Sequence, residues 1–378
     1  MNPRYVPILR TKQGEFDAYG NLSPSAKRDI LPLFDLSAFA PSARRSKTYN
    51  SLPNPVEVYI NDRAHHVSQV VGQASLMVDI FKWAPNSSIE NGEHVLSFYS
   101  YRLESLGCNV IPVIGYERWE DREYSSVLKG MSERYRSFCI RLESFAFDDM
   151  IEEEPFVECI EDIIESMALN VKECGVILDF ADVTKPSESV IELGVKISTA
   201  LRLLDAYDFK FISIAGCSVS EIVNDMVPEQ NSTGLVVRKE MLAWKTARSF
   251  NRKQRLVFGD YGVVNPELGD DIIAPDANGK IRYAIPEKIF VVRGYSRRTG
   301  AKGAQMYELS KELVRSHHYL GAGFSWGDSK VADCANELLM GNPMNWVSFD
   351  TNHHITFVLG EIFEFERSLE VGEVKALA

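Results

Sequence analysis

Charged side chains follow several short apolar runs of this sequence, at the points where the runs end. The clearest run is Val176–Phe180, in which three aliphatic residues lead to Asp179. If such runs are parallel strands of one barrel, their carboxyl ends meet at one rim, where barrel enzymes hold their active sites. The residues expected at this rim are Lys12, Asp35, Asp62, Arg141, Asp179, Asp182 and Asp260. Carboxylates and cations gathered in this way can transfer protons or stabilise the charge of a phosphate group.

Arg141 is the most informative of these residues because it lies inside the apolar run Phe138–Leu142. A permanently charged guanidinium needs a partner when it is buried, and Asp179 on the next predicted strand is the expected one. The pair is either a structural ion pair or part of a catalytic centre, and the sequence leaves both interpretations open. The catalytic candidates are Lys12, Asp35, Arg141, Asp179, Asp260, His353 and His354.

Asp179 and Asp260 are also candidate ligands for Mg²⁺ or Mn²⁺, which prefer oxygen donors. The contiguous spacing of a known metal motif is absent around them, so the signal for a metal is weak. The six cysteines lie far apart without a CxxC pair. Neither a zinc site nor a disulfide framework is indicated.

A small-residue segment, Gly216–Glu221, follows the seventh predicted strand, where barrels commonly bind phosphate. Backbone N–H groups at a helix N-terminus attract anions, and Ser218 with Glu221 has the spacing of a capping box. Ser218 is therefore a candidate ligand-binding residue, with an ordinary helix N-terminus as the alternative.

Basic residues after the eighth predicted strand give further ligand-binding candidates, Arg282, Arg293 and Arg298. The loop Arg297–Lys302 is dense in positive charge, which suits a phosphate or a nucleic-acid strand. A simple solvated loop is the alternative, because charge runs are usually that.

Histidines occur mainly as doublets, and His353 and His354 follow Asn352, which is predicted to open the last helix. Either histidine can act as an acid or a base near neutral pH. Neighbouring residues on a helix point about 100° apart, so the doublet is not expected to hold one metal ion.

The order of elements predicts an α/β protein with a single (β/α)₈ barrel that covers residues 1–378. The predicted strands are Arg4–Leu9, Ile30–Leu36, Val56–Asp62, Asn109–Ile114, Phe138–Leu142, Gly175–Asp182, Phe209–Ile214 and Leu256–Tyr261. An insertion at about 265–345 is expected after the eighth strand, with paired strands at Lys280–Ile285 and Lys288–Tyr295. The closing helix is predicted at Asn352–Arg367.

Composition narrows the functional classes. The net charge of −12 disfavours a general polyanion binder, although a local basic loop leaves nucleic acid as a candidate partner. No secretory signal and no run of eighteen apolar residues is visible, so a cytoplasmic protein without a membrane partner is expected.

A set of short motifs in a fixed order resembles the beta-protein family of bacteria, temperate phages and satellite phages. The motifs are Tyr5–Leu9, Ile111–Ile114, Ile140–Leu142, Leu178-Asp179, Arg238–Glu240 with Trp244, Phe258–Tyr261, Ile281–Tyr283, Val292–Gly294, Gly323–Ser325, Gly341-Asn342, Asn345-Trp346 and Asn352–His354. The resemblance implies a TIM-type barrel encoded in mobile elements near phage-defence genes. It implies no reaction.

The resulting functional hypothesis is a component of a mobile-element or anti-phage system. Its barrel rim would bind a phosphorylated ligand or a nucleic-acid end and hydrolyse a phosphoester. The alternative is a non-enzymatic recognition or scaffold protein that binds a phage protein or an operon-encoded defence partner.

Overall fold

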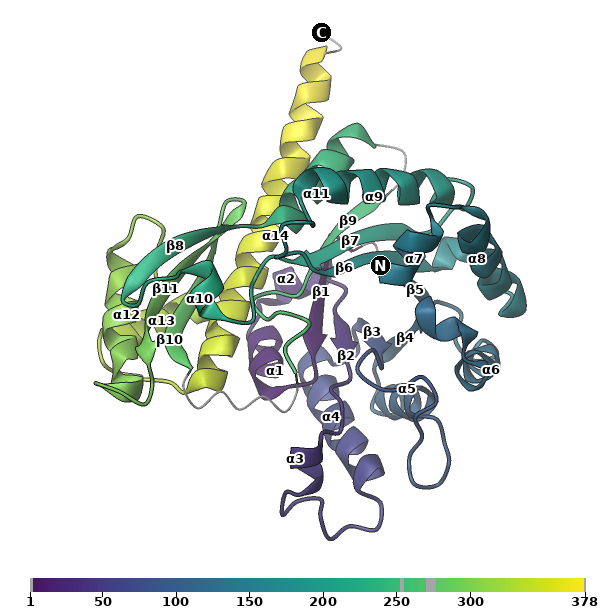
Figure 1. Cartoon of the computed structure of the whole chain (residues 1–378), viewed down its shortest axis with the longest axis horizontal. Helices are drawn as coiled ribbons and strands as arrows, with labels where there is room; N and C mark the ends of the chain where they lie inside the picture. Colours follow the sequence, from purple (N-terminus) through teal and green to yellow (C-terminus); the bar gives the residue numbers. More distant parts are fainter. Residues whose placement is uncertain (1–2, 252–254, 270–276, 377–378) are drawn as a thin grey trace.

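Eight parallel strands close into a barrel in the computed structural model, which describes residues 3–251, 255–269 and 277–376 (Figure 1). In order around the barrel they are β1 (Tyr5–Arg10), β2 (Leu33–Asp35), β3 (Ser75–Asp79), β4 (Asn109–Gly115), β5 (Cys139–Leu142), β6 (Gly175–Asp182), β7 (Phe211–Cys217) and β9 (Leu256–Asp260). β9 pairs with both β7 and β1, which closes the ring. The predicted (β/α)₈ fold is confirmed.

Alternation of side chains along the strands builds two cores. One face of each strand contributes to a cluster inside the barrel, which includes Ile8, Leu33, Met77 and Ile177. The next residues along these strands, such as Phe34 and Val78, pack beneath the surrounding helices. Each such side chain contributes roughly 1.5–3 kcal/mol when it is fully buried.

Helices connect the strands, and most of them cover the outside of the barrel (Figure 1). They are α1 (Gln13–Gly20), α2 (Pro24–Asp29), α3 (Pro41–Arg44), α4 (Pro55–Val71), α5 (Val95–Ser105), η1 (Glu117–Glu120), α6 (Arg122–Met131), α7 (Ser144–Asp149), α8 (Glu154–Ser166), η2 (Val171–Glu173), α9 (Val190–Leu204), α10 (Val223–Met226) and α11 (Lys239–Phe250). No helix within the described ranges has the length and apolarity needed to cross a membrane.

The predicted strand Val56–Asp62 is wrong, because this segment begins α4. Val56, Tyr59, Ile60, Ala64 and Val67 are buried, and their spacing of three and four residues is helical. The third barrel strand is β3, which was not predicted. Asp62 therefore lies within a helix, where its carboxylate accepts a hydrogen bond from Tyr49.

A three-stranded antiparallel sheet stands beside the barrel, in the strand order β10, β11, β8. β10 (Asn278–Ile285) and β11 (Lys288–Ser296) confirm the predicted inserted pair, whereas β8 (Ser232–Val237) was not predicted. η3 (Lys302–Ala304), α12 (Gln305–Arg315) and α13 (Trp326–Ala335) complete this side unit.

The final helix, α14 (Pro343–Ala376), runs between the barrel and the side unit, and its last turns project from the body (Figure 1). It packs against α1, α13 and β10. The predicted start at Asn352 is wrong, because the helix begins at Pro343, a residue suited to a first helical turn. Asn352, His353 and His354 consequently lie inside the helix.

The close approach of α13 to α14 requires glycine at position 327. A Cβ atom there would lie 2.2 Å from the carbonyl oxygen of Phe349. Gly327→Ala is therefore expected to lower the free energy of unfolding by about 1–3 kcal/mol. Gly360→Ala is the matched control, since nothing lies within 4 Å of its Cβ position on α14. Denaturant titration should show Gly360→Ala unchanged or stabilised by about 0.5–1 kcal/mol, and equal effects of the two changes would contradict the packing argument.

Candidate functional site

Arg141 lies at the carboxyl end of β5, fully buried, at the centre of a cluster of acidic side chains. Its Nη1 atom lies 2.8 Å from Asp35 Oδ1 and 2.8 Å from Asp79 Oδ2. Its Nε atom donates to Asp179 Oδ2 at 2.8 Å, and Nη2 donates to the hydroxyl of Tyr261 at 2.8 Å. The guanidinium group of Arg141 therefore links side chains at the carboxyl-terminal ends of β2, β3, β6 and β9. The predicted pair of Arg141 with Asp179 is present.

A second arginine shares this acidic cluster. Arg118, on η1, donates to Asp79 Oδ1 at 2.6 Å and to Asp79 Oδ2 at 2.9 Å. Its Nη2 atom also lies 3.5 Å from Glu143 Oε1. Among the described residues, the buried Glu143 Oε1 and Arg118 Nε atoms have no hydrogen-bond partner. This side of the cluster is therefore less completely hydrogen-bonded than the side around Arg141.

Burial divides the carboxyl groups of the cluster into two kinds. Burial raises the pKa of Asp35 to about 6, although Arg141 partly opposes the shift. Burial likewise raises the pKa of Glu143 to about 7. For Asp79, the effect of burial is outweighed by Arg118 and Arg141, which together lower its pKa. Carboxyl groups whose environments separate their pKa values in this way can act as acid and base at one site.

The cluster opens toward solvent through a narrow cavity on the carboxyl side of the barrel. Asp35 and Tyr261 of the cluster line this cavity, together with Arg10, Phe81 and Lys82. It holds about 20 Å³ of solvent space, and about 10–15 Å³ is enough for one water molecule. Asp35 is thus the carboxyl group of the cluster that lines a water-sized space.

A separate buried cluster surrounds Asp260 at the end of β9. Tyr5 donates to its Oδ1 atom at 2.5 Å, and His354 Nε2 lies 2.7 Å from its Oδ2 atom. These contacts outweigh burial and lower the pKa of Asp260. Since His354 comes from α14, this pair also holds the last helix against the barrel.

His353 points into the side unit instead. Its Nδ1 atom lies 2.8 Å from Asp328 Oδ2, and its Nε2 atom lies 2.9 Å from the carbonyl oxygen of Ala284. Its ring stacks on Tyr283, with 3.6 Å between the centroids. His353 and His354 therefore contact different clusters, because adjacent residues on a helix point in different directions.

The predicted ligand-binding residues are dispersed. Arg282 is buried and paired with Asp350 at 3.0 Å. Arg293 is buried and donates to the carbonyl oxygens of Val227 and Pro228. Arg298 lies in an exposed turn after β11. Arg282 and Arg293 thus make internal contacts that stabilise the packing of the side unit.

Ser218 does not begin a helix. The following helix, α10, is a short turn that starts at Val223, so the predicted capping box with Glu221 is wrong. The hydroxyl of Ser218 donates to Glu240 and accepts from the backbone N–H of Lys239, which ties β7 to α11. Burial raises the pKa of Glu240 to about 7.

The remaining predicted rim residues lie at strand exits. Lys12 follows β1 and is partly buried. Asp182 ends β6, where its carboxylate accepts from the backbone N–H of Thr184 at 3.0 Å.

Protein donors occupy the carboxylates that were candidate ligands for Mg²⁺ or Mn²⁺. Asp179 accepts hydrogen bonds from Arg141, Tyr261 and the backbone of Ala181. Across the described ranges, no group of three or more His, Cys, Asp or Glu side chains is arranged to hold a metal ion. Four carboxyl groups of the acidic cluster, those of Asp35, Asp79, Asp179 and Glu143, share the two guanidinium groups of Arg118 and Arg141.

Comparisons with known proteins give a family. The family model described as Beta protein matches residues 5–360. The curated protein named Protein beta, from Enterobacteria phage P4, is 21% identical over 384 residues, covering 98% of this chain and 96% of the relative. Among solved structures, the biosynthetic arginine decarboxylase of Campylobacter jejuni is 10% identical, with a TM-score of 0.38, covering 94% of this chain and 55% of the decarboxylase.

Proposed function

This chain belongs to the Beta protein family, and from that membership we propose that it serves a phage or other mobile element in defence against competing phages. In this proposal the barrel rim binds a phosphorylated ligand or a nucleic-acid end and hydrolyses a phosphoester. The similarity to a protein of phage P4 supports the mobile-element setting.

One observation carries the chemical part of the proposal. Asp35, whose pKa is raised to about 6, lines a cavity that can hold a water molecule at the carboxyl end of the barrel. Above pH 6 its carboxylate is the base that removes a proton from this water, and the water then attacks phosphorus. The leaving oxygen takes a proton from solvent.

The phosphate is best placed at the mouth of the cavity, beside Arg10 and Lys82. Arg10 Nε is 3.1 Å from Glu15 Oε1, whereas the Lys82 ammonium lies 5.0 Å from the centre of the Phe81 ring. Arg141, one of the catalytic candidates predicted from the sequence, has all of its nitrogens committed to carboxylates and Tyr261. Its role here is to position Asp35.

Asp35→Asn tests the proposal, because it removes the base with little change in size. Hydrolysis of bis-p-nitrophenyl phosphate, a phosphodiester, should fall about 100-fold or more. The wild-type rate should rise as the pH increases through about 6, the pKa of Asp35. On cells whose otherwise intact locus carries Asp35→Asn, plaque counts should rise to the level seen on cells that lack the locus.

Asp208→Asn is the matched control, since the Asp208 side chain is 80% exposed. It should retain both hydrolysis and protection. If folded Asp35→Asn protects as well as wild type, the rim is not the working site and the proposal fails.

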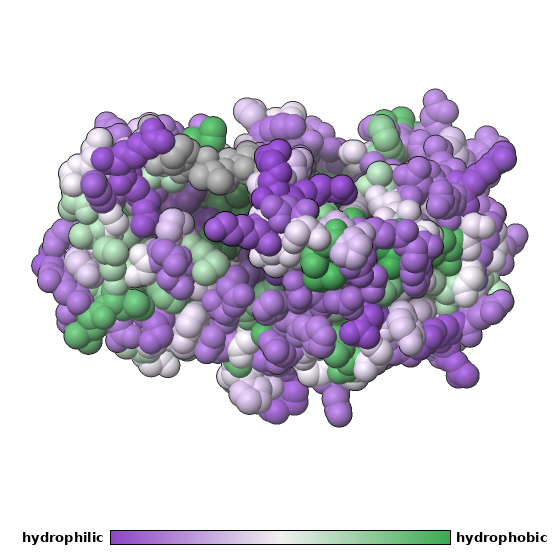
Figure 2. All heavy atoms as spheres, turned by 90° about the horizontal axis from the view of Figure 1, so that it is seen from below, coloured by the Kyte–Doolittle hydropathy of each residue, from purple (hydrophilic) through white to green (hydrophobic). Residues whose placement is uncertain are grey.

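A non-enzymatic recognition protein is the second candidate, favoured by the dense internal bonding of Arg141. It predicts that Asp35→Asn and Asp179→Asn retain protection while surface changes abolish it. The face seen in Figure 2 is largely hydrophilic, with hydrophobic side chains in small separate groups. Elsewhere, Ile191 and Phe250 are exposed by 78% and 88% and offer surface positions for substitution to serine.

A further inference from the structure

A much larger cavity lies at the opposite end of the barrel, where the strands begin. Its volume is about 450 Å³, within the range of roughly 300–1,000 Å³ that is usual for small-molecule sites. It is lined by the first residues of five consecutive strands, Ser75, Asn109, Cys139, Gly175 and Phe211. None of these residues belongs to the acidic cluster.

The inner surface of this cavity is apolar. A Cβ atom on Gly175 would lie 2.3 Å from the Phe211 ring, so glycine allows the ring to lie against the start of β6. Leu31, Ile111 and Phe138 line the same cavity. Together they form a hydrophobic floor that includes an aromatic ring, and only the edges of these side chains reach the cavity, since Phe211, Leu31 and Phe138 are exposed by 4%, 3% and 1%.

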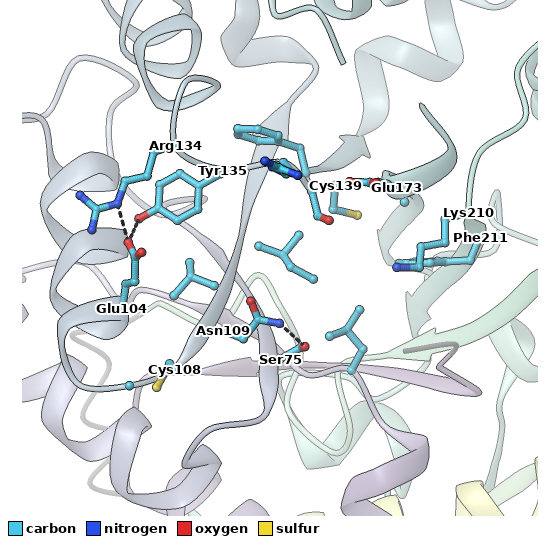
Figure 3. A pocket seen from close by; sticks show the side chains of 18 residues that line it. Ser75, Glu104, Cys108, Asn109, Arg134, Tyr135, Cys139, Glu173, Lys210 and Phe211 are labelled. Carbon is cyan, nitrogen blue, oxygen red and sulfur yellow. Dashed lines mark hydrogen bonds and ion pairs between the residues drawn. The ribbon is translucent and has the colours of Figure 1, made fainter. Parts of the chain in front are cut away.

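Polar groups form the outer walls (Figure 3). On one side, Glu104 accepts from Arg134 at 2.7 Å and from the Tyr135 hydroxyl at 3.1 Å. Asn109 donates to Ser75 Oγ at 2.7 Å. On the other side, Lys210 extends its amine toward the cavity. These internal bonds fix the first wall in place.

Two cations of the cavity are available to a ligand. Arg136 and Lys210 both line it, and neither forms an ion pair within the described part of the chain. With Arg134 paired to Glu104, the remaining charged lining groups are Arg136, Lys210 and Glu173. They leave a net positive charge at this cavity in a protein whose net charge is −12, which favours an anionic ligand. An aromatic ring with one attached anionic group matches both features.

We propose that this cavity is a second ligand site, separate from the rim, that binds a small aromatic anion. The flat body of the ligand packs against Phe211 and its neighbours. Its carboxylate or phosphate group pairs with Lys210 and Arg136. The site does not depend on the hydrolytic function proposed for the rim.

Titration calorimetry with 2-naphthoate tests this site, with the neutral 2-naphthamide as the comparison ligand. Wild type should bind 2-naphthoate saturably below about 1 mM, and 2-naphthamide at least about tenfold more weakly. Lys210→Met and Arg136→Met remove the charge and keep an unbranched side chain, nearly as long as lysine but shorter than arginine. Each should weaken 2-naphthoate binding about tenfold while leaving 2-naphthamide binding unchanged.

Two matched controls locate the binding. Lys172→Met changes a side chain that is 71% exposed and outside the cavity, so it should bind 2-naphthoate like wild type. Asp35→Asn should also bind it normally, which separates this site from the rim. Absence of saturable binding to wild type at about 5 mM, or equal affinity of wild type and both cation variants, would overturn the proposal.

Discussion

Replacing Arg141 with glutamine is expected to lower the free energy of unfolding by about 3–5 kcal/mol at pH 7. The reason is that Arg141 alone contacts Asp35, Asp79 and Asp179 together. Without the guanidinium, these buried carboxyl groups either repel one another as anions or must take up protons. The loss should therefore shrink as the pH falls, because protonation removes the unpaired charge.

Urea titrations between pH 5 and pH 8 measure this effect. Arg202→Gln is the control, since Arg202 pairs with Glu153 at the surface and its side chain is 58% exposed. That change should cost no more than about 1 kcal/mol. A similar small loss for Arg141→Gln would mean that the buried cluster is not held together by its central cation.

Glu143→Gln is expected to stabilise the protein above pH 7 by up to about 3 kcal/mol, from a pKa raised from 4.5 to about 7. Below pH 4.5 the group is protonated in both states. Between these values the folded state holds the proton more tightly than the unfolded state, so stability falls as the pH rises. Glutamine cannot lose that proton, and the advantage of the variant grows through this interval.

The comparison is the difference in free energy of unfolding between wild type and variant at pH 5 and at pH 8. The exposed Glu133, changed to glutamine, is the control and should give the same small difference at both values. A Glu143→Gln protein that is less stable than wild type at pH 8 would show that the ionised carboxylate is the favoured form. If the stabilised variant loses protection, the wild type keeps this acid at a cost to stability, as functional sites often do.

The barrel could be predicted because most of its strands are apolar runs between helices of adequate length. β3 was missed because the preceding segment, Val56–Ile60, has alternating β-branched residues and was predicted as the third strand in its place. Such a stretch is too short to distinguish a strand from a helix. The longer helical spacing through Val67 and the stop at Gly72 were the signals available. After that stop, Leu76–Asp79 repeats the pattern of aliphatic residues leading to an aspartate.

The acidic cluster could be predicted only in part. Asp35, Arg141 and Asp179 were found because they end strands, and Asp79 was missed together with its strand. Arg118 had no such signal, since it reaches the cluster from η1, and its position depends on Gly115. A Cβ atom at Gly115 would lie 2.1 Å from Arg118 Nε. The contact of Arg118 with Asp79 joins segments that are distant in sequence. It depends on tertiary packing, which the spacing of residues in one sequence does not encode.

The position of α14 has a consequence for the order in which the protein can mature on the ribosome. All eight barrel strands precede Pro343, yet Asp260 meets His354 and Arg238 meets Glu361 only when α14 has docked. When all barrel strands have left the ribosome but α14 has not, Asp260 and Arg238 still lack their partners on that helix. Docking of the last helix therefore completes the fold late in synthesis. Nascent chains that stall before α14 is made expose incompletely packed surface, which chaperones bind.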